Sequence, residues 1–184
     1  MSGNSESGRV SKSLSISRAK GKWNDRVVTD TGTQVPCPLM SLIQTILFYC
    51  EHHSKLSGYS VSFRRAEKDG LVAASGICKF LTDTMTVPDH DQVVMQSKFW
   101  SSAASFSFCD REYRWKDTMR ASELRTDRGN IVAHFKRELC AWRKDGELEI
   151  YVQETDLPTD VIIISFIMYL YRRMEVTSRG GRWG

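Results

Sequence analysis

The sequence predicts a mainly β protein built around one hydrophobic helix, and two observations support this fold class. Short stretches in which apolar and polar residues alternate recur along the chain, with turn signals between them. The segment Val161–Tyr171 is instead apolar at every helical angle, with Ser165 as its only polar residue. Alternation at period two is typical of half-buried antiparallel strands, and a helix that is hydrophobic all round must be enclosed. We therefore expect an antiparallel barrel, or a strongly curved sheet, around this helix.

Length and composition indicate one globular domain. The 184 residues are 41% hydrophobic and 26% charged, which is the size and balance of a single folded unit. The five cysteines are odd in number and widely spaced, and no two form a CxxC pair; they are Cys37, Cys50, Cys78, Cys109 and Cys140. We expect small buried apolar side chains in a reducing, cytoplasmic compartment rather than a disulfide framework.

The N-terminal residues 1–22 are rich in serine and basic residues and poor in large apolar groups. Such a segment cannot offset the entropy of its own ordering, so we expect a mobile tail. It lacks the apolar region of a signal peptide. It could serve as a phosphorylatable or basic docking arm, or be a plain solvated terminus. The domain is expected over residues 23–176, followed by a C-terminal tail over 177–184.

The stretch 35–57 interrupts the alternating pattern with the helix-like apolar run "LMSLIQTILFYC". We expect a helix or a long insertion there. Neither this run nor Val161–Tyr171 reaches the ~20 apolar residues of a spanning helix, so the sequence predicts no transmembrane segment.

Five strands are expected from the alternation, with inward sets that begin at Tyr59, Phe106, Tyr113, Ile131 and Leu148. The inward sets are Tyr59, Val61 and Phe63; Phe106 and Phe108; Tyr113 and Trp115; Ile131, Ala133 and Phe135; and Leu148, Ile150 and Val152. The motif "KDG" occurs twice, at Lys68–Gly70 and Lys144–Gly146, and Asp-Gly between two β-like runs predicts a hairpin turn at each.

The helix is expected to begin after "LPTD", where Thr159 or Asp160 could cap its N-terminus. Arg172 and Arg173 close its C-terminal end, where cations interact favourably with the helix dipole. Burial of about ten large side chains, at roughly 1.5–3 kcal/mol each, would place this helix at the centre of the core.

Candidate catalytic and metal-binding groups are sparse. Cys50, Glu51, His52 and His53 form the one local set of potential metal ligands, without a second pair to complete a zinc site. His90 is expected in a polar loop and His134 on a solvated strand face. Asp110 and Glu112 lie beside arginines and favour surface ion pairs. No GxSxG, phosphate loop or HExxH motif occurs. We expect no cofactor, no metal and no enzymatic activity.

Basic and aromatic residues interleave in "DREYRWKD", from Asp110 to Asp117. On a strand, Tyr113 and Trp115 would share one face, with Arg114 and Lys116 on the other. Arg111, Arg114 and Lys116 are candidate contacts to an anionic surface, such as phosphate head groups. The alternative is a strand with core aromatic residues and an ordinary solvated basic face.

The order of these motifs resembles the fungal tubby-C-like domain of unknown function. In that family a "YRWK" strand is followed by an "IVAHFK" strand, a "GELEIYV" strand and a terminal apolar helix introduced by an aspartate. Here they correspond to Tyr113–Lys116, Ile131–Lys136, Gly146–Val152 and Asp160–Tyr171. "KWNDRVVTD" and "GYSVSFRR" resemble the family's earlier strands. The resemblance implies a closed antiparallel barrel threaded by the C-terminal helix, as in tubby and the phospholipid scramblases.

The superfamily includes phosphoinositide binders, so the resemblance implies a non-enzymatic binding or scaffold module with weak attachment to anionic membranes. The phosphoinositide motif of tubby itself is not recognisable, and no lipid-binding residue is transferred. The alternatives are a protein–protein interaction domain without a lipid role and an unrecognised hydrolase. The net charge of +4 is carried by the two chain ends around a slightly acidic body. This distribution argues against specific nucleic-acid binding, and we expect a monomer.

Overall fold

The computed structural model describes residues 10–20, 22, 24–31, 45–55, 58–79, 82–87, 92–97, 103–118, 121–138 and 144–180. These residues form twelve strands and one helix. The strands are β1 (Lys12–Arg18), β2 (Arg26–Asp30), β3 (Thr45–Lys55), β4 (Gly58–Arg65), β5 (Val72–Cys78), β6 (Thr82–Thr86), β7 (Val93–Ser97), β8 (Ala104–Phe108), β9 (Arg111–Asp117), β10 (Ala121–Thr126), β11 (Ile131–Arg137) and β12 (Lys144–Ile150), and the helix is α1 (Thr159–Gly180).

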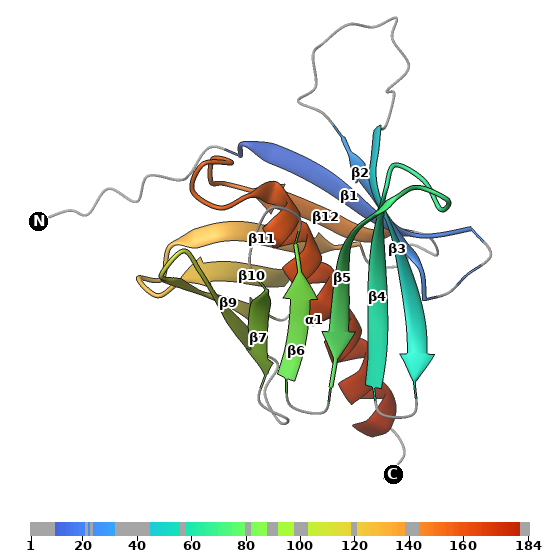
Figure 1. The fold of residues 1–184 in the computed structure, drawn as a ribbon. Helices are drawn as coiled ribbons and strands as arrows, with labels where there is room; N and C mark the ends of the chain where they lie inside the picture. The colour runs from blue at the N-terminus through green and yellow to red at the C-terminus, as the bar shows by residue number, and fades with distance from the viewer. Residues whose placement is uncertain are drawn as a thin grey trace, which may run out of the picture.

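The strands form one closed antiparallel barrel (Figure 1). Each strand pairs with its neighbours in the sequence, and β12 returns to pair with β1, so that Leu14 lies opposite Leu148. Closure leaves no free sheet edge among the described strands. The predicted fold class, a mainly β barrel around a hydrophobic C-terminal helix, is confirmed.

Helix α1 runs through the barrel and supplies the centre of the core (Figure 1). Every side chain from Val161 to Met168 is fully buried. The ring of Phe166 packs against Trp115 from β9 and Phe135 from β11, at centroid distances of 5.0 and 4.5 Å. Gly76 on β5 permits a close approach, because a Cβ there would lie 2.1 Å from the Met168 sulfur. The barrel interior is therefore packed with side chains, which leaves the outer surface and the two rims for binding.

The two ends of α1 are fixed to the barrel by polar contacts. At the N-terminus the carboxylate of Glu154 accepts hydrogen bonds from the Thr159 amide, at 2.8 Å, and from its hydroxyl. Glu154 is thus the cap, and the predicted capping role of Thr159 or Asp160 is wrong; Asp160 instead pairs with Arg65 of β4. At the other end Arg173 binds Asp117 of β9, at 2.7 Å.

The predicted inward faces agree with the structure for most strands. Tyr59, Val61 and Phe63 are buried in β4. In β11 the expected set is shifted, because Leu124 pairs with Ala133 whereas Arg125 pairs with Ile131. Val132 is the extra residue of this β-bulge and is buried, so Ile131 becomes exposed.

The predicted mobile tail over residues 1–22 is wrong for Lys12–Arg18, which form β1. Leu14 and Ile16 are fully buried, and Ser15 between them is 8% exposed. Pairing with β2 on one side and β12 on the other satisfies the backbone of β1, so two large apolar residues suffice to hold it. Residues 1–9 lie outside the described part of the chain.

The predicted helix or insertion over residues 35–57 is wrong from Thr45 onward, where the chain forms β3. Phe48 and Cys50 are fully buried, and Tyr49 on the opposite face is also largely covered. Burial on both faces over Phe48–Cys50 contributes to the apolar run that indicated a helix, although Ile46 is 40% exposed. Residues 35–44, 56 and 57 lie outside the described residues.

The first KDG motif forms the β4–β5 turn, but the second lies inside β12. Gly146 faces β11 so closely that a Cβ would lie 2.1 Å from the Lys136 carbonyl oxygen. Ile16 pairs with Gly146 and Ser17 with Lys144, so Asp145 is the extra residue of a β-bulge. The glycine is thus required by strand packing rather than by a turn, and the second predicted hairpin position is wrong.

Helix α1 continues to Gly180, so the predicted boundary at residue 177 falls inside the helix; residues 181–184 lie outside the described part. Of the cysteines, Cys50 and Cys78 are buried as expected, whereas Cys109 is exposed in the β8–β9 turn. Cys37, Cys140 and His90 are not among the described residues.

Candidate functional site

Strand β9 presents its predicted basic residues from a rigid base. Tyr113 and Trp115 are buried, and the Trp115 indole N–H donates to the Ser165 hydroxyl of α1 at 3.1 Å. The same indole stacks on Tyr169 at a centroid distance of 5.8 Å. The strand is thereby fixed to the central helix, and the side chains that alternate with its aromatic residues are exposed.

Arg114 and Lys116 share the outer face of β9, but Arg111 does not. Alternation places Arg111 on the side of Tyr113, at the exposed rim, directly after the β8–β9 turn in which Cys109 and Asp110 both have positive φ. The structure thus brings two of the three predicted anion contacts together and separates the third.

The basic side chains of β9 have few acidic partners. The Arg114 guanidinium lies 3.6 Å from Glu112, and its side chain is 62% exposed. Arg125, the β10 residue opposite Arg114, also carries a positive charge, and it binds Glu123, the residue opposite Lys116. Within the described part of the chain, Arg111 and Lys116 make no ion pair. A net positive surface therefore remains on this strand.

Many other cations are held in ion pairs with acids of the barrel. These pairs are Arg18 and Arg26 with Asp145, Lys136 with Glu149, Lys144 with Glu138 and Glu147, and Arg137 and Arg173 with Asp117. Lys136, Arg137 and Lys144 also line a surface hollow of about 240 Å³ on β11 and β12 together with Glu138 and Glu147. Because its cations are already neutralised, the hollow is a weaker anion site than β9.

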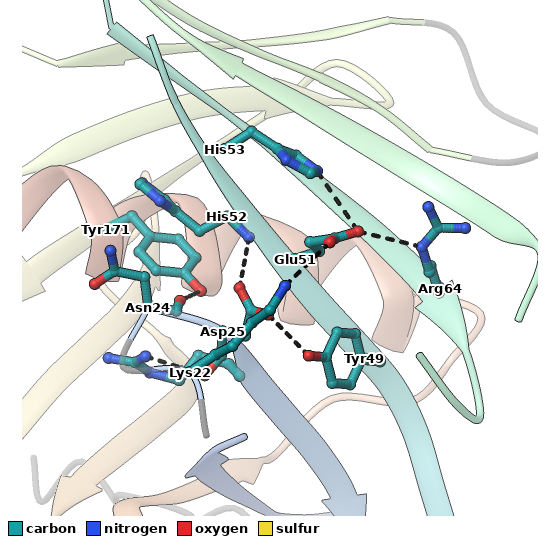
Figure 2. Close-up of polar contacts among 10 residues, drawn as sticks. Lys22, Asn24, Asp25, Tyr49, Glu51, His52, His53, Arg64 and Tyr171 are labelled. Carbon is teal, nitrogen blue, oxygen red and sulfur yellow. Dashed lines mark hydrogen bonds and ion pairs between the residues drawn. The ribbon is translucent and has the colours of Figure 1, made fainter. Parts of the chain in front are cut away.

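The predicted metal ligands on β3 point to opposite faces of the strand. Cys50 is fully buried in the core. His52 points toward Tyr171 of α1, whereas Glu51 and His53 lie on the outer side of the strand (Figure 2). Glu51 pairs with Lys22 and Arg64, each at 3.5 Å, and lies 3.6 Å from His53. No group of three potential metal ligands occurs among the described residues.

Asp25 is a buried carboxylate that the sequence did not single out. It accepts hydrogen bonds from the Tyr49 hydroxyl at 2.8 Å and from the His52 amide at 3.1 Å, and it pairs with Lys22 at 3.4 Å (Figure 2). These contacts tie the start of β2 to β3. The carboxylate is fully occupied by structural partners.

The His52 ring connects the barrel rim to the last turns of α1. It lies 5.0 Å from the Tyr59 ring and 4.8 Å from the Tyr171 ring, and the Tyr59 hydroxyl donates to the Met168 carbonyl. Burial lowers the pKa of His52. An uncharged imidazole is therefore favoured in this aromatic cluster.

Asp83 and Cys78 form a second buried polar group beside α1. Burial raises the pKa of Asp83 to about 6, although the Arg172 guanidinium, 3.4 Å away, favours the charged form. Burial also raises the pKa of the Cys78 thiol well above its ordinary value. A buried, protonated thiol is the opposite of an activated nucleophile.

The remaining predicted groups lie on the surface. His134 lies on the outer face of β11, 3.9 Å from Glu149, and Asp110 and Glu112 are exposed at the β8–β9 hairpin. Asp25 and Asp83 were missed because their partners are distant in sequence. Among the described residues, α1 lacks a window long and apolar enough to cross a membrane.

Comparison with known proteins shows a shared fold. Neither a scan against protein-family models nor a search of curated proteins found a match. The chain is similar to the X-ray structure of a protein from Arabidopsis thaliana, over 90% of this chain and 93% of that chain, with a TM-score of 0.55 and 10% sequence identity. A likeness at this identity concerns the fold alone. It places the chain with a known barrel architecture.

Proposed function

We propose that this chain is a non-enzymatic binding module of the fungal tubby-C-like kind, which attaches weakly to anionic membrane surfaces from the cytoplasm. The observation that carries the proposal is the outer face of β9, where Arg114 and Lys116 are exposed and Lys116 makes no ion pair within the described residues. Arg111 at the neighbouring rim adds a third cation.

A binding role is favoured over catalysis because the barrel interior is filled. Side chains of α1 occupy the lumen, and the polar groups beside it bind one another. Cys78, which lies beside the buried carboxylate of Asp83, is 2% exposed, and burial favours its protonated thiol. A ligand is thus expected on the outer surface.

The expected attachment is weak and sensitive to salt. Each exposed cation near an anionic leaflet contributes about 1 kcal/mol. Two or three such groups give about 2–3 kcal/mol, which is far short of stable anchoring by one domain. Detectable binding therefore requires a high density of anionic lipid, and it should fall as ionic strength shortens the range of the interaction.

Co-sedimentation with phosphatidylcholine vesicles, with and without phosphoinositide, tests the proposal. The double variant Arg114→Gln/Lys116→Gln should lose roughly thirty-fold in vesicle affinity, which corresponds to about 2 kcal/mol. The matched control is Lys136→Gln/Lys144→Gln, which removes the same charge from cations already paired with acids. This control should keep most of the binding.

Equal binding to neutral and phosphoinositide vesicles at physiological salt would overturn the proposal. An equal loss of vesicle affinity in the two double variants would also overturn it. Binding would then depend on the net charge of the protein and not on the cations of β9.

A protein–protein interaction domain without a lipid role is the second candidate. The observation that favours it is the outer face of β5–β8, which carries no charged side chain among its described residues. A partner captured in a pull-down at high salt, and lost on substitution of this face, would support it over membrane attachment.

A further inference from the structure

The lumen side of β5 brings two sulfur atoms together beside α1. The Cys78 thiol lies 3.9 Å from the Met168 thioether, and both side chains are buried. Gly76, two residues before Cys78 on the same strand, leaves the space that the thioether occupies, because a Cβ there would lie 2.1 Å from the Met168 sulfur. The packing of α1 on β5 thus holds the thioether next to the thiol.

Asp83 adds a carboxylate to the two sulfur atoms from the neighbouring strand. It lies opposite Cys78 in the β5–β6 pair, and its side chain is fully buried. Its Oδ1 atom lies 3.4 Å from the Arg172 guanidinium, whereas its Oδ2 atom has no hydrogen-bond partner within the described part of the chain. A buried carboxylate oxygen without a partner requires an explanation, and a bound cation is one.

The separation of the two sulfur atoms suits a metal ion. Two metal–sulfur bonds of about 2.3 Å span 3.9 Å when the angle between them is about 115°, which is close to trigonal. The third position of a trigonal site is then left for Asp83. This set is not a group of three among His, Cys, Asp and Glu ligands, because its third member is a thioether. Thiolate and thioether ligands together favour a soft ion such as Cu(I).

The charges around the sulfur atoms favour a monovalent ion. The charged side chains that face Cys78 are Asp83 from β6 and Arg172 from α1, and the uncharged Tyr59 hydroxyl faces it from β4. With Cu(I) bound to a Cys78 thiolate, the two anions balance the ion and the guanidinium. A divalent ion would leave one uncompensated positive charge in the core, which is costly.

We propose that Cys78, Met168 and Asp83 form a Cu(I)-binding site in the barrel. On binding, Cu(I) takes the place of the Cys78 thiol proton, which passes to solvent, and neither sulfur nor copper changes oxidation state. The site replaces the expectation of no metal that was drawn from the sequence. It goes beyond the proposed membrane attachment and uses no residue of β9.

The position of the site gives the ion a short route from solvent. Cys78 is the last residue of β5, and the next residue, Lys79, is exposed. Helix α1 contacts both β5 and β6 (Figure 1). An ion that passes the β5–β6 turn therefore reaches the two sulfur atoms without crossing the packed centre of the core.

Anaerobic competition for Cu(I) with the chelator bathocuproine tests the site in the full chain. Cys37, Cys109 and Cys140 are first replaced by serine, because other thiols also bind Cu(I). This background protein should bind one Cu(I) ion. Its apparent affinity should rise about tenfold per unit of pH between about pH 7 and 8, since burial keeps the Cys78 thiol protonated and one proton is displaced.

Substitutions in this background identify the ligands. Met168→Leu and Asp83→Asn nearly conserve side-chain volume, and each should lower the Cu(I) affinity at least about tenfold. Cys78→Ser should abolish one-to-one binding. Cys50→Ala is the matched control, because Cys50 is also fully buried, and it should keep the affinity. X-ray absorption should show two sulfur neighbours of copper in the background protein and one in Met168→Leu.

Three results would overturn the proposal. The first is a background protein that binds Cu(I) no more tightly than Cys78→Ser does. The second is an unchanged affinity in Met168→Leu, and the third is an equal loss of affinity in Cys50→Ala. Circular dichroism of each variant checks that the barrel remains folded. A failure of vesicle binding would leave all of these measurements unaffected, so the two proposals are tested separately.

Discussion

At the scale of single residues, the hydrogen bond between Trp115 and Ser165 shows how one polar residue is accommodated in a helix that is otherwise apolar. The Ser165 hydroxyl accepts from the indole N–H and donates to the Ile162 carbonyl at 3.0 Å, and both side chains are fully buried. The serine therefore supplies the hydrogen-bond acceptor that the buried Trp115 indole requires, which explains a polar residue in an otherwise apolar helix.

Ser165→Ala should lower the free energy of unfolding by about 1–3 kcal/mol, because it leaves the Trp115 N–H buried without a partner. Urea unfolding followed by tryptophan fluorescence measures the change. Ser107→Ala, at an exposed position on β8, serves as the control and should change stability by less than about 0.5 kcal/mol. A Ser165→Ala protein as stable as the control would show that the hydrogen bond contributes nothing net.

Asp83 makes stability depend on pH. Its pKa is raised from 3.8 to about 6 by burial, so the folded state binds its proton more tightly than the unfolded state. The stability from this group is fully present below the unfolded pKa and is lost as pH rises through about 6, by about 3 kcal/mol.

Asp83→Asn removes this dependence. The unfolding free energy of the variant, minus that of the wild type, should increase by about 3 kcal/mol from about pH 4 to about pH 7. The pKa of His52 is shifted in the opposite direction, but His52 is present in both proteins and cancels in the difference. Chemical denaturation across this range gives the result. A constant difference would mean that Asp83 titrates at its ordinary pKa.

The alternation in "REYRWK" was enough to predict which side chains of β9 face the core and which face solvent. The same alternation already places Arg111 on the side of Tyr113, away from Arg114 and Lys116; it could not show that position 111 is exposed, because that follows from where the hairpin ends. Asp25 and Asp83 were beyond prediction for another reason. Their burial depends on Tyr49 and Arg172, which approach only in the folded barrel.

At the scale of elements, helix α1 determines whether the strands have a core. Ile163 and Phe166 are fully buried in the lumen. Ile163→Asp or Phe166→Asp should prevent folding, because an uncompensated buried charge costs several kcal/mol against a total stability of about 5–15 kcal/mol.

Leu71→Asp provides the control for this prediction, since Leu71 is 87% exposed, and this variant should fold normally. Far-ultraviolet circular dichroism and gel filtration distinguish folded from unfolded protein. A soluble, normally folded Ile163→Asp variant would contradict the role of α1 as the centre of the core.

The two strands that sequence patterns missed were hidden for different reasons. β1 does alternate, with Leu14 and Ile16 flanked by serines, but the pattern is short and lies in a serine-rich, basic stretch whose composition indicated a tail. β3 contains an apolar run because Tyr49 is covered on the outer face while its neighbours fill the core. Alternation identifies a strand most clearly when one face is solvated and the other packs on a core.

At the scale of the whole molecule, the fold class followed from the sequence because a helix hydrophobic on all sides must be enclosed, and the described strands supply the enclosure. What binds the outer surface could not be predicted in the same way. The outer faces of β5–β8 and of β9 differ in charge, and the two meet where β8 pairs with β9 in a hairpin.

The position of α1 also constrains how the chain folds during synthesis. The helix is the last described element, yet its side chains form the centre of the core, and β1 cannot complete its pairing until β12 has been made. Before α1 leaves the ribosome, the inward faces of the strands have nothing to pack against. The barrel must therefore form after nearly all of the described chain has been translated, and its earlier strands stay exposed to chaperones and to aggregation until that moment.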